Sequence, residues 1–339
     1  MITRTAPGWQ TEDWQIALSS AVRTVEELWR VLELPLEALP AALAAHRDFP
    51  VRVPQAFLGK IERGNPDDPL LRQILPLAAE TLSAPGFVAD PLGERDVNRA
   101  SGLLHKYRSR VLLVLSGTCA INCRYCFRRH FPYEDNRLGS EEFEQIHDYL
   151  LQQPDVNEVI LSGGDPLVIS NARLARLLQV IESIPHIARL RIHSRLPVVI
   201  PQRVDQGLLR LLGESRLKSV LVTHCNHPNE LDGDFDLAMK LLAGQGVTLL
   251  NQAVLLRGVN DRAEIQVALS ERLFLAGVLP YYLHLLDPVA GAHHFDVPES
   301  EARPLMQTLH GALPGFLVPR LVRELPGRSG KTPIDLHLA

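Results

Sequence analysis

Cys119-Ala120-Ile121-Asn122-Cys123-Arg124-Tyr125-Cys126 places three cysteines at CxxxCxxC spacing. The stretch directly follows the apolar run 111–115, which predicts a buried strand. Thiolates bind iron–sulfur clusters, and a four-iron cluster normally takes four protein ligands. The only other cysteine, Cys225, lies about a hundred residues further on. Three close ligands would leave one iron open to a small molecule, as an open position lets a catalytic metal bind its substrate.

Two other interpretations of the three cysteines stay open, a structural zinc site and a group of buried thiols. Zinc usually takes four cysteine or histidine ligands in paired CxxC units, and the sequence has no second CxxC. His130 could still supply a fourth ligand. The spacing favours the iron–sulfur cluster.

Composition narrows the class of protein. The chain has 339 residues, of which 46% are hydrophobic, enough for a barrel-sized core and an additional lobe. A net charge of -4 and a pI near 6.4 argue against a nucleic-acid-binding surface. No apolar run approaches the roughly 18 residues of a membrane span, and the first residues lack a signal-peptide core. Three clustered cysteines suit a metal site in a reducing compartment, so we expect a cytoplasmic enzyme without nucleic-acid or membrane partners.

An alternation of strand and helix patterns begins near residue 110. The predicted strands are 111–115, 156–161, 190–193, 219–223, 247–254 and 278–285, and the predicted helices between them are 141–152, 171–184, 206–212, 234–242 and 263–276. This order predicts parallel strands joined by right-handed crossovers. A doubly wound open sheet fits the same order. Polar residues follow almost every strand, as at the catalytic rim of parallel α/β barrels, so we predict an α/β fold with an incomplete (β/α)6 barrel.

The flanks of this core carry different patterns. Residues 1–100 show short amphipathic helical patterns, with Thr24 as a candidate cap for a helix that begins before Glu26 and Glu27. After Asp287 the alternation ends, and 298–309 predicts one further helix. We therefore expect a helical amino-terminal region over 1–100, a barrel core over 101–290 and a carboxyl-terminal extension over 291–339.

The segment after the second predicted strand is rich in glycine. Paired glycines let the backbone approach a ligand closely, and the exposed amide and carbonyl groups can then bind its polar ends. As a plain turn, Ser162-Gly163-Gly164-Asp165-Pro166 would need no ligand. Its significance depends on its position, one strand after the cysteine loop.

In that position the two motifs together resemble the radical S-adenosylmethionine (radical SAM) superfamily, whose core is also a (β/α)6 partial barrel. In that superfamily the open iron of a [4Fe-4S] cluster chelates the amino and carboxylate groups of S-adenosylmethionine. The resemblance implies that Cys119, Cys123 and Cys126 bind the cluster. It also implies S-adenosylmethionine contacts from the GGE-like segment, that is from Ser162, Gly163, Gly164 and Asp165.

A closer resemblance, from about residue 57 to 333, is to the lysine 2,3-aminomutase family. It rests on five stretches besides the cysteine loop: 103–107 (LLHKY), 194–199 (SRLPVV), 223–230 (THCNHPNE), 251–261 (NQAVLLRGVND) and 330–333 (GKTP). The family implies the reaction of L-lysine to β-lysine, an isomerisation that uses S-adenosylmethionine, a [4Fe-4S] cluster and pyridoxal 5′-phosphate (PLP). Free L-lysine and an external electron donor would be its partners.

The family resemblance assigns roles to individual residues. Lys331 matches the lysine that forms a Schiff base with PLP, although without this context it would be interpreted as a surface charge. Arg110 matches a position near the PLP phosphate, where a guanidinium suits the anion. Asn251 and Gln252 fall in the region around S-adenosylmethionine and PLP.

Three further residues match the family's substrate-binding positions. Arg128 would pair with the α-carboxylate of lysine, and Asp287 and Glu324 would hold its distal ammonium. A long cationic substrate needs such opposite charges at its two ends, because an unpaired buried charge is costly. Glu324 departs from the aspartate of the catabolic lysine enzymes, which lengthens this side chain by one methylene group.

The resemblance also separates two branches of the family. Catabolic members continue past GKTP into a tail with zinc-binding cysteines, whereas this sequence has no cysteine after Cys225. That resembles the bacterial branch that makes (R)-β-lysine for modifying translation elongation factor P, a modification completed by a ligase-like enzyme. The alternative is a catabolic enzyme that gives (S)-β-lysine, and a homo-oligomer is possible in either branch.

Two hypotheses lie further away: a radical SAM enzyme that acts on a protein-bound lysine, and a non-catalytic protein that binds iron–sulfur or zinc. Among the remaining candidates, His224 and His227 are expected to position loops and cofactor. His293 and His294 are expected to cap or pack near the last barrel element, and Cys225 to be a buried small residue.

Overall fold

One ten-stranded sheet organises the computed structural model, which describes residues 13–94, 97–133, 138, 140–328 and 330–337. The strands lie side by side in chain order, from β1 to β10. Neighbouring strands from β3 to β9 are parallel, while β1 and β2 at one edge and β10 at the other are antiparallel to their neighbours. The strands are β1 Asn98–Ala100, β2 Leu103–Tyr107, β3 Arg110–Ser116, β4 Glu158–Gly163, β5 Arg189–Ser194, β6 Lys218–His224, β7 Thr248–Val254, β8 Leu279–His284, β9 Arg320–Arg323 and β10 Thr332–Pro333.

The six predicted strands are β3 to β8, and the predicted α/β fold with a parallel sheet is confirmed. A helix follows most of them in the chain, as the crossovers require. These helices are α6 Ser140–Leu151, α7 Asn171–Glu182, α8 Leu196–Val199, α9 Gln206–Glu214, α10 Gly233–Gly244, α11 Ala263–Leu275 and α12 Glu299–Ala312. Among the described residues, no helix combines the length and the apolar character needed to cross a membrane.

Side-chain caps define where several of these helices begin. The hydroxyl of Ser170 accepts from the backbone N–H of Arg173 at the start of α7, and Asp205 and Asp232 cap α9 and α10 in the same way. The apolar side chains of each helix then face the sheet. Leu174, Leu177, Leu178 and Ile181 of α7 are all buried in one continuous core with the strands.

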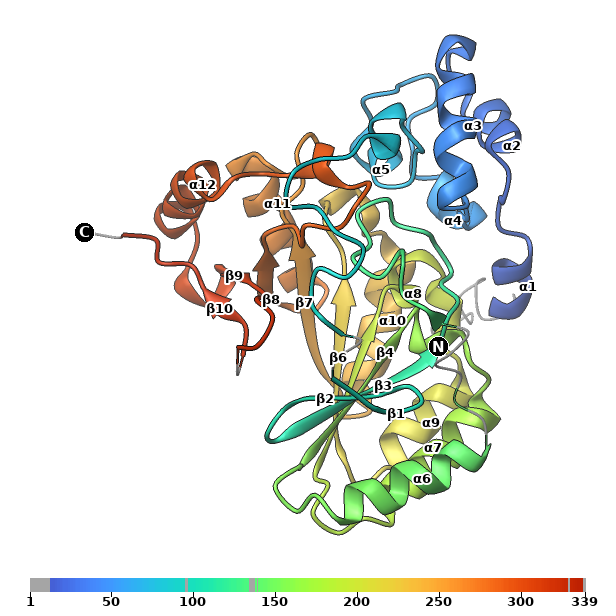
Figure 1. Cartoon of the computed structure of the whole chain (residues 1–339), viewed down its shortest axis with the longest axis vertical. Helices are drawn as coiled ribbons and strands as arrows, with labels where there is room; N and C mark the ends of the chain where they lie inside the picture. The colour runs from blue at the N-terminus through green and yellow to red at the C-terminus, as the bar shows by residue number, and fades with distance from the viewer. Residues whose placement is uncertain (1–12, 95–96, 134–137, 139, 329, 338–339) are drawn as a thin grey trace, which may run out of the picture.

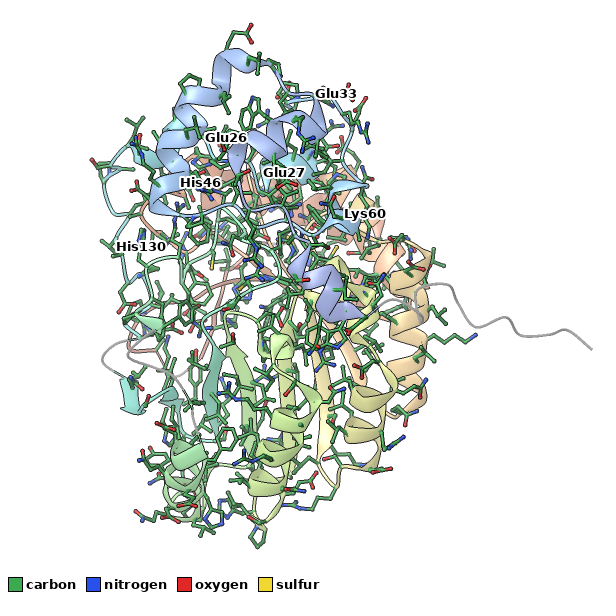
Figure 2. The ribbon with its side chains drawn as sticks, turned by 90° about the vertical axis from the view of Figure 1, so that its right-hand side faces the viewer. Glu26, Glu27, Glu33, His46, Lys60 and His130 are labelled. Carbon is green, nitrogen blue, oxygen red and sulfur yellow. The ribbon has the colours of Figure 1, made fainter. Side chains whose placement is uncertain are left out.

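The amino-terminal region lies beyond the carboxyl ends of the strands, toward which the arrowheads of β6 and β7 point (Figure 1). It contains α1 Trp14–Ser19, α2 Val25–Leu32, α3 Leu39–Asp48, α4 Gln55–Leu58 and α5 Pro69–Arg72. Thr24 caps α2 through the N–H of Glu27, as predicted. Lys60, labelled in Figure 2, anchors this region to the loop after β6, because its ammonium contacts Asp232 at 2.8 Å and the Glu230 carbonyl at 2.7 Å.

The last part of the chain returns to the sheet. β9 pairs with β8 in parallel, and β10 pairs with β9. Both strands lie within the predicted carboxyl-terminal extension, so that segment continues the core sheet. Ahead of β1, Val88 makes a parallel bridge to Val289 in the loop after β8. The segment before the sheet therefore crosses the carboxyl ends of its last strands.

Candidate active site

The cysteine loop leaves the end of β3 and is held by backbone contacts to the amino-terminal region. The N–H of Asn122 donates to the Arg52 carbonyl at 3.0 Å, and that of Arg124 to the Gln73 carbonyl at 2.9 Å. The guanidinium of Arg124 is completely buried on the carboxylate of Glu80, at 2.6 Å. These contacts fix the loop against the amino-terminal region.

All four cysteines are free thiols, and Cys119, Cys123 and Cys126 lie close enough for their charges to act on one another. Burial and the neighbouring cysteines raise the pKa of Cys119 well above its ordinary value and that of Cys126 to about 11. A bound cation would reverse this penalty by stabilising the thiolates. The three sulfurs thus fit an iron–sulfur cluster.

A single metal ion fits these residues less well. Among the described residues, no three histidine, cysteine or acidic side chains come close enough to share one ion. A zinc ion draws its thiolates to about 2.3 Å, whereas each cysteine of a four-iron cluster binds a different iron. His130, the candidate fourth zinc ligand, places Nε2 3.1 Å from the Ala290 carbonyl instead.

The two glycines of the GGDP segment are required by the chain itself. A Cβ at Gly163, whose φ is +124°, would lie 2.7 Å from the Ser116 carbonyl, and one at Gly164 would lie 2.6 Å from that of Thr118. Both oxygens belong to the residues just before Cys119. The glycines therefore let the loop after β4 pack against the start of the cysteine loop.

Two predicted cofactor residues use their side chains to join strands. The carboxylate of Asp165 accepts from the backbone N–H groups of Leu167, Arg195 and Leu196 and from the hydroxyl of Ser194. The amide of Asn251 links β6 to β7 through the hydroxyl of Thr223 and the backbone of Cys225. Any contact of Asp165 with a ligand is thus left to its backbone. Gln252 is half-buried beside Asn251 in β7.

Lys331 and Glu324 are direct partners. Their charged atoms lie 2.8 Å apart, and the other carboxylate oxygen of Glu324 accepts from Lys106 at 2.8 Å and from the Tyr107 hydroxyl at 3.0 Å. Burial by itself would raise the pKa of Glu324, but the ammonium groups of Lys331 and Lys106 hold it well below its usual range. Glu324 follows β9 and Lys106 lies in β2. The contact between their side chains therefore connects strands near the two opposite edges of the sheet.

Asp287, in the loop after β8, has the opposite protonation behaviour. Burial, and then the negative charge of Glu324, raise its pKa to about 7. The charges of Lys331, Glu94 and Lys106 also act on it. The two predicted acidic ligands are thus neighbours, one ionised and one poised to titrate near neutrality.

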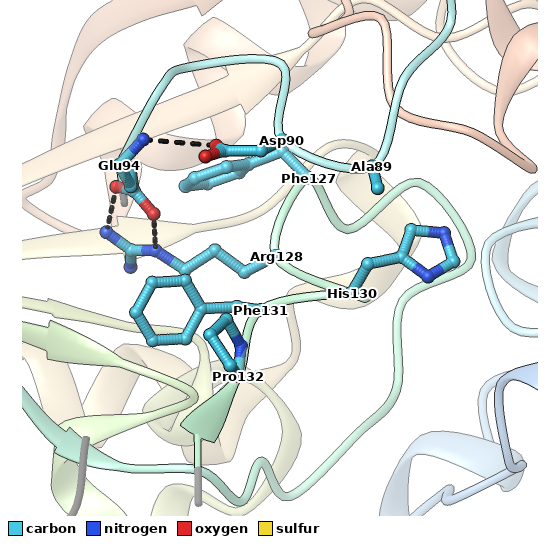
Figure 3. Close-up of a pocket in the computed structure, with 8 residues that line it drawn as sticks. All are labelled: Ala89, Asp90, Glu94, Phe127, Arg128, His130, Phe131 and Pro132. Carbon is cyan, nitrogen blue, oxygen red and sulfur yellow. Dashed lines mark hydrogen bonds and ion pairs between the residues drawn. The ribbon is translucent and has the colours of Figure 1, made fainter. Parts of the chain in front are cut away.

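Arg128 is engaged by a residue that sequence reasoning missed. Its Nε and Nη2 atoms donate to the two carboxylate oxygens of Glu94 at 2.7 and 2.6 Å (Figure 3). Its Nη1 atom donates to Ser162 Oγ and the Gly163 carbonyl. A guanidinium has five N–H groups, so one remains. Arg128 can therefore grip a second carboxylate by two hydrogen bonds only if Glu94 moves away.

Arg110 begins β3 and lies over the ring of Tyr107, with its guanidinium carbon 4.0 Å from the ring centroid. Because Tyr107 also reaches Glu324, Arg110 is connected to Lys331 through two intermediate side chains.

Buried histidines complete the surroundings of Lys331. Burial, with Lys331 among the further causes, lowers the pKa values of His193 and His284 well below the ordinary range, and Nε2 of each is buried without a partner among the described residues. Buried polar atoms nearly always have a hydrogen-bond partner, so these two nitrogens are available to a polar ligand. The residues present therefore fit a group such as PLP beside Lys331. His224, whose pKa burial lowers to about 4, packs edge-on to Tyr125.

The other histidines and Cys225 have structural surroundings. His227 caps a short 3-10 helix by accepting from the N–H of Asn229, and Cys225 is fully buried, as expected. His293 and His294 pack on Phe87 and Phe295 after the last core strand.

Sequence signals for the missed residues differ. Lys106 and Tyr107 belong to the LLHKY stretch and could have been found there, whereas no local pattern distinguishes Glu94.

Comparison with known proteins places these features in a family. Residues 113–264 match the model of the radical SAM superfamily. The L-lysine 2,3-aminomutase of Escherichia coli (strain K12) is 50% identical over 328 residues, which are 96% of each chain. That of Haemophilus influenzae is 48% identical over 95% of this chain and 96% of its own, and that of Clostridium subterminale 36% identical over 95% and 77%. A solved structure of anSMEcpe with bound AdoMet and the Cp18Cys peptide aligns with a TM-score of 0.46 and 13% identity, over 60% of this chain and 58% of its own.

Proposed function

Because this chain belongs to the L-lysine 2,3-aminomutase family of radical SAM enzymes, we propose that it converts free L-lysine to (R)-β-lysine for the modification of elongation factor P. The family consists of isomerases that use a [4Fe-4S] cluster, S-adenosylmethionine and PLP. When bound, these groups supply an electron, a hydrogen-abstracting radical and an electron sink for the migrating nitrogen. An external donor would first reduce the cluster.

The observation that carries the proposal is the pairing of Lys331 with Glu324 beside Asp287. It supports Lys331 as the residue that holds PLP, because the charge of this half-buried amine acts on His193 and His284, whose Nε2 atoms have no partner among the described residues. Arg110 would serve the phosphate from the far side of Tyr107. Cys119, Cys123 and Cys126 would hold the cluster. The loop of Ser162, Gly163, Gly164 and Asp165, together with Asn251 and Gln252, would border S-adenosylmethionine.

For the substrate, we assign opposite charges to the two ends. Arg128 would take the α-carboxylate, which must displace Glu94 from the guanidinium. Glu324 and the ionised form of Asp287 would hold the distal ammonium. If Lys331 held PLP, its amine would no longer be a free ammonium partner of Glu324, and that carboxylate oxygen would be available to the substrate. Fixing both ends of lysine would determine which β-hydrogen faces the radical.

One residue supports the branch assignment. Glu324 replaces the aspartate that the resemblance associates with the catabolic branch. A role in modifying elongation factor P would place the enzyme in the cytoplasm and couple it to a ligase-like enzyme that transfers β-lysine.

The test is anaerobic turnover of the reconstituted protein with S-adenosylmethionine, PLP, a reductant and free L-lysine, followed by chiral analysis of the product. (R)-β-lysine supports the proposal. The (S) isomer would instead support the catabolic alternative. Cleavage of S-adenosylmethionine without β-lysine would reject free lysine as the substrate and favour a protein-bound one.

A further inference from the structure

We propose that Arg195 and Glu230 together set the reduction potential of the cluster held by the cysteine loop. The inference rests on the assignment of Cys123 as a cluster ligand. The guanidinium would stabilise the reduced, more negative cluster, and the carboxylate behind it would limit that effect.

Arg195 follows β5 directly and is 5% exposed. Its Nη1 atom lies 2.7 Å from Cys123 Sγ and 2.7 Å from the hydroxyl of Tyr125. A hydrogen bond to a ligand sulfur and a nearby positive charge both favour the reduced state of an iron–sulfur cluster. Arg195 brings both to Cys123.

The guanidinium is fixed on its other side. Nη2 donates to Gln73 Oε1 at 2.7 Å and to Glu230 Oε2 at 2.8 Å. Glu230 is completely buried and also accepts from the side chain of Gln73 and the backbone N–H of Asn226. Because these partners come from the amino-terminal region and the loop after β6, Arg195 has little freedom to turn away from Cys123.

The neighbouring residue of the cysteine loop belongs to the same group. The hydroxyl of Tyr125 lies 2.6 Å from Asn226 Nδ2 and 3.4 Å from Gln73 Oε1, besides its contact with Arg195. Tyr125 lies between Cys123 and Cys126 in sequence, so one polar group immobilises the middle of the loop. The guanidinium of Arg195 therefore lies between the sulfur of Cys123 and the carboxylate of Glu230.

The fifth N–H of Arg195 supports a ligand outside the chain. Nε is buried and has no hydrogen-bond partner among the described residues, although the other four N–H groups are used. Buried donors are nearly always satisfied. A polar group bound beside Arg195 is the chemistry that would accept this N–H.

The order of charges gives a test by sign. Arg195→Gln removes the positive charge and exposes the cluster to Glu230, so the midpoint potential should become more negative. Glu230→Gln leaves the positive charge uncompensated, so the potential should become more positive. We expect about a tenfold change in the reduction equilibrium constant for each, which is about 59 mV for one electron.

The measurement is an EPR-monitored dithionite titration of the anaerobically reconstituted proteins without S-adenosylmethionine, in which the cluster takes up one electron. Arg203→Gln is the matched control, because Arg203 is also fully buried but contacts Leu167, Asp205 and Trp14. The Arg195→Gln/Glu230→Gln variant avoids an unpaired buried carboxylate and should have a potential between those of the single variants.

Opposite shifts in the two single variants, with an unchanged Arg203→Gln control, support the inference. Unchanged potentials, or shifts in the same direction, overturn it, because a merely structural defect has no reason to follow the sign of the charge. If Arg195→Gln does not fold, the Glu230→Gln and double variants decide. Full cluster content in Cys123→Ser would overturn the premise, whereas an intact cluster without β-lysine formation would reject only the proposed function.

Discussion

Asp287 and Glu324 are neighbouring carboxylates, yet opposite effects determine their charge states. Glu324 has two ammonium partners and a tyrosine hydroxyl, and its pKa lies well below the usual range. Asp287 has no direct ammonium partner at hydrogen-bond distance among the described residues, and burial beside Glu324 raises its pKa to about 7. Both are largely buried, so direct charge pairing decides which of them is ionised.

This difference in charge state implies different roles for the two carboxylates at the distal end of the substrate. Glu324 is ionised in the free enzyme and is already paired, whereas Asp287 gains its charge near neutral pH. An arriving ammonium would favour ionisation of Asp287, since an opposite charge nearby lowers a carboxyl pKa. The five predictions that follow test this contrast.

The largest effect is expected from Lys331, which holds Glu324 ionised and is the proposed PLP residue. Lys331→Ala and Lys331→Arg should both reduce β-lysine formation by about 10²–10⁴-fold, the range for a positioned acid–base group. Only Lys331→Ala should also weaken the environment of Glu324, because arginine keeps the positive charge. Turnover and covalent PLP retention after borohydride reduction measure the first effect, and thermal stability measures the second. Retained turnover in both variants, matching that of the exposed Lys240→Ala control, would contradict the assignment.

Glu324→Gln should have the next largest effect, because it leaves the ammonium groups of Lys331 and Lys106 without their shared carboxylate. We expect the free energy of unfolding to fall by about 1–3 kcal/mol, as for loss of a buried charged partner, and KM for lysine to rise. Denaturant unfolding of the cofactor-free protein measures the stability change. Glu264→Gln, in an exposed pair with Arg262, should cost little in the same assay.

Asp287 should make the free energy of unfolding fall as pH rises. Between the unfolded-state pKa near 3.9 and the folded value of about 7, only the folded protein retains the proton, so its stability falls as pH rises, by up to about 1.4 kcal/mol per pH unit. Asp287→Asn should remove this component, which is roughly 2 kcal/mol between pH 5 and 7. Denaturant unfolding at the two pH values measures it.

The same residue should govern lysine binding. Because only the ionised form of Asp287 attracts an ammonium, KM should fall as pH rises from 6 to 8 in the wild type and stay flat in Asp287→Asn. Equal slopes in the two proteins would show that another group titrates.

The smallest effect is expected from Glu94, which contributes to the raised pKa of Asp287 and occupies Arg128. Glu94→Gln should lower KM for lysine by about fivefold, roughly 1 kcal/mol, because the substrate carboxylate no longer competes with a resident one. It should also move the pH profile of KM toward lower pH. An increased KM would mean that Glu94 positions Arg128 for the substrate rather than competing with it.

Local patterns in the sequence were sufficient for the core of the fold. The predicted runs 219–223 and 247–254 correspond to β6 and β7. Both runs could be predicted because alternating or continuous apolar residues of this length are a local pattern typical of buried strands. β9 was not predicted from the sequence. It has only four residues, too few for a clear periodic pattern, and it forms by pairing with β8. The CxxxCxxC loop was recognisable for the same reason as the core strands, since its chemistry lies within eight consecutive residues.

The sequence by itself therefore determined the parallel α/β core and the cysteine loop and, through the family resemblance, Lys331, Asp287 and Glu324 as candidate site residues. Only the tertiary structure decided which side chains are partners. Lys106 contacts Glu324, which is 218 residues away in the sequence, Glu94 contacts Arg128, 34 residues away, and Arg195 contacts Cys123, 72 residues away. The physical reason is that propensity and periodicity act between near neighbours in the chain, whereas charge pairing and burial act through space. Whether Asp287 or Glu324 is ionised depends on charged groups that only the folded sheet brings close to them.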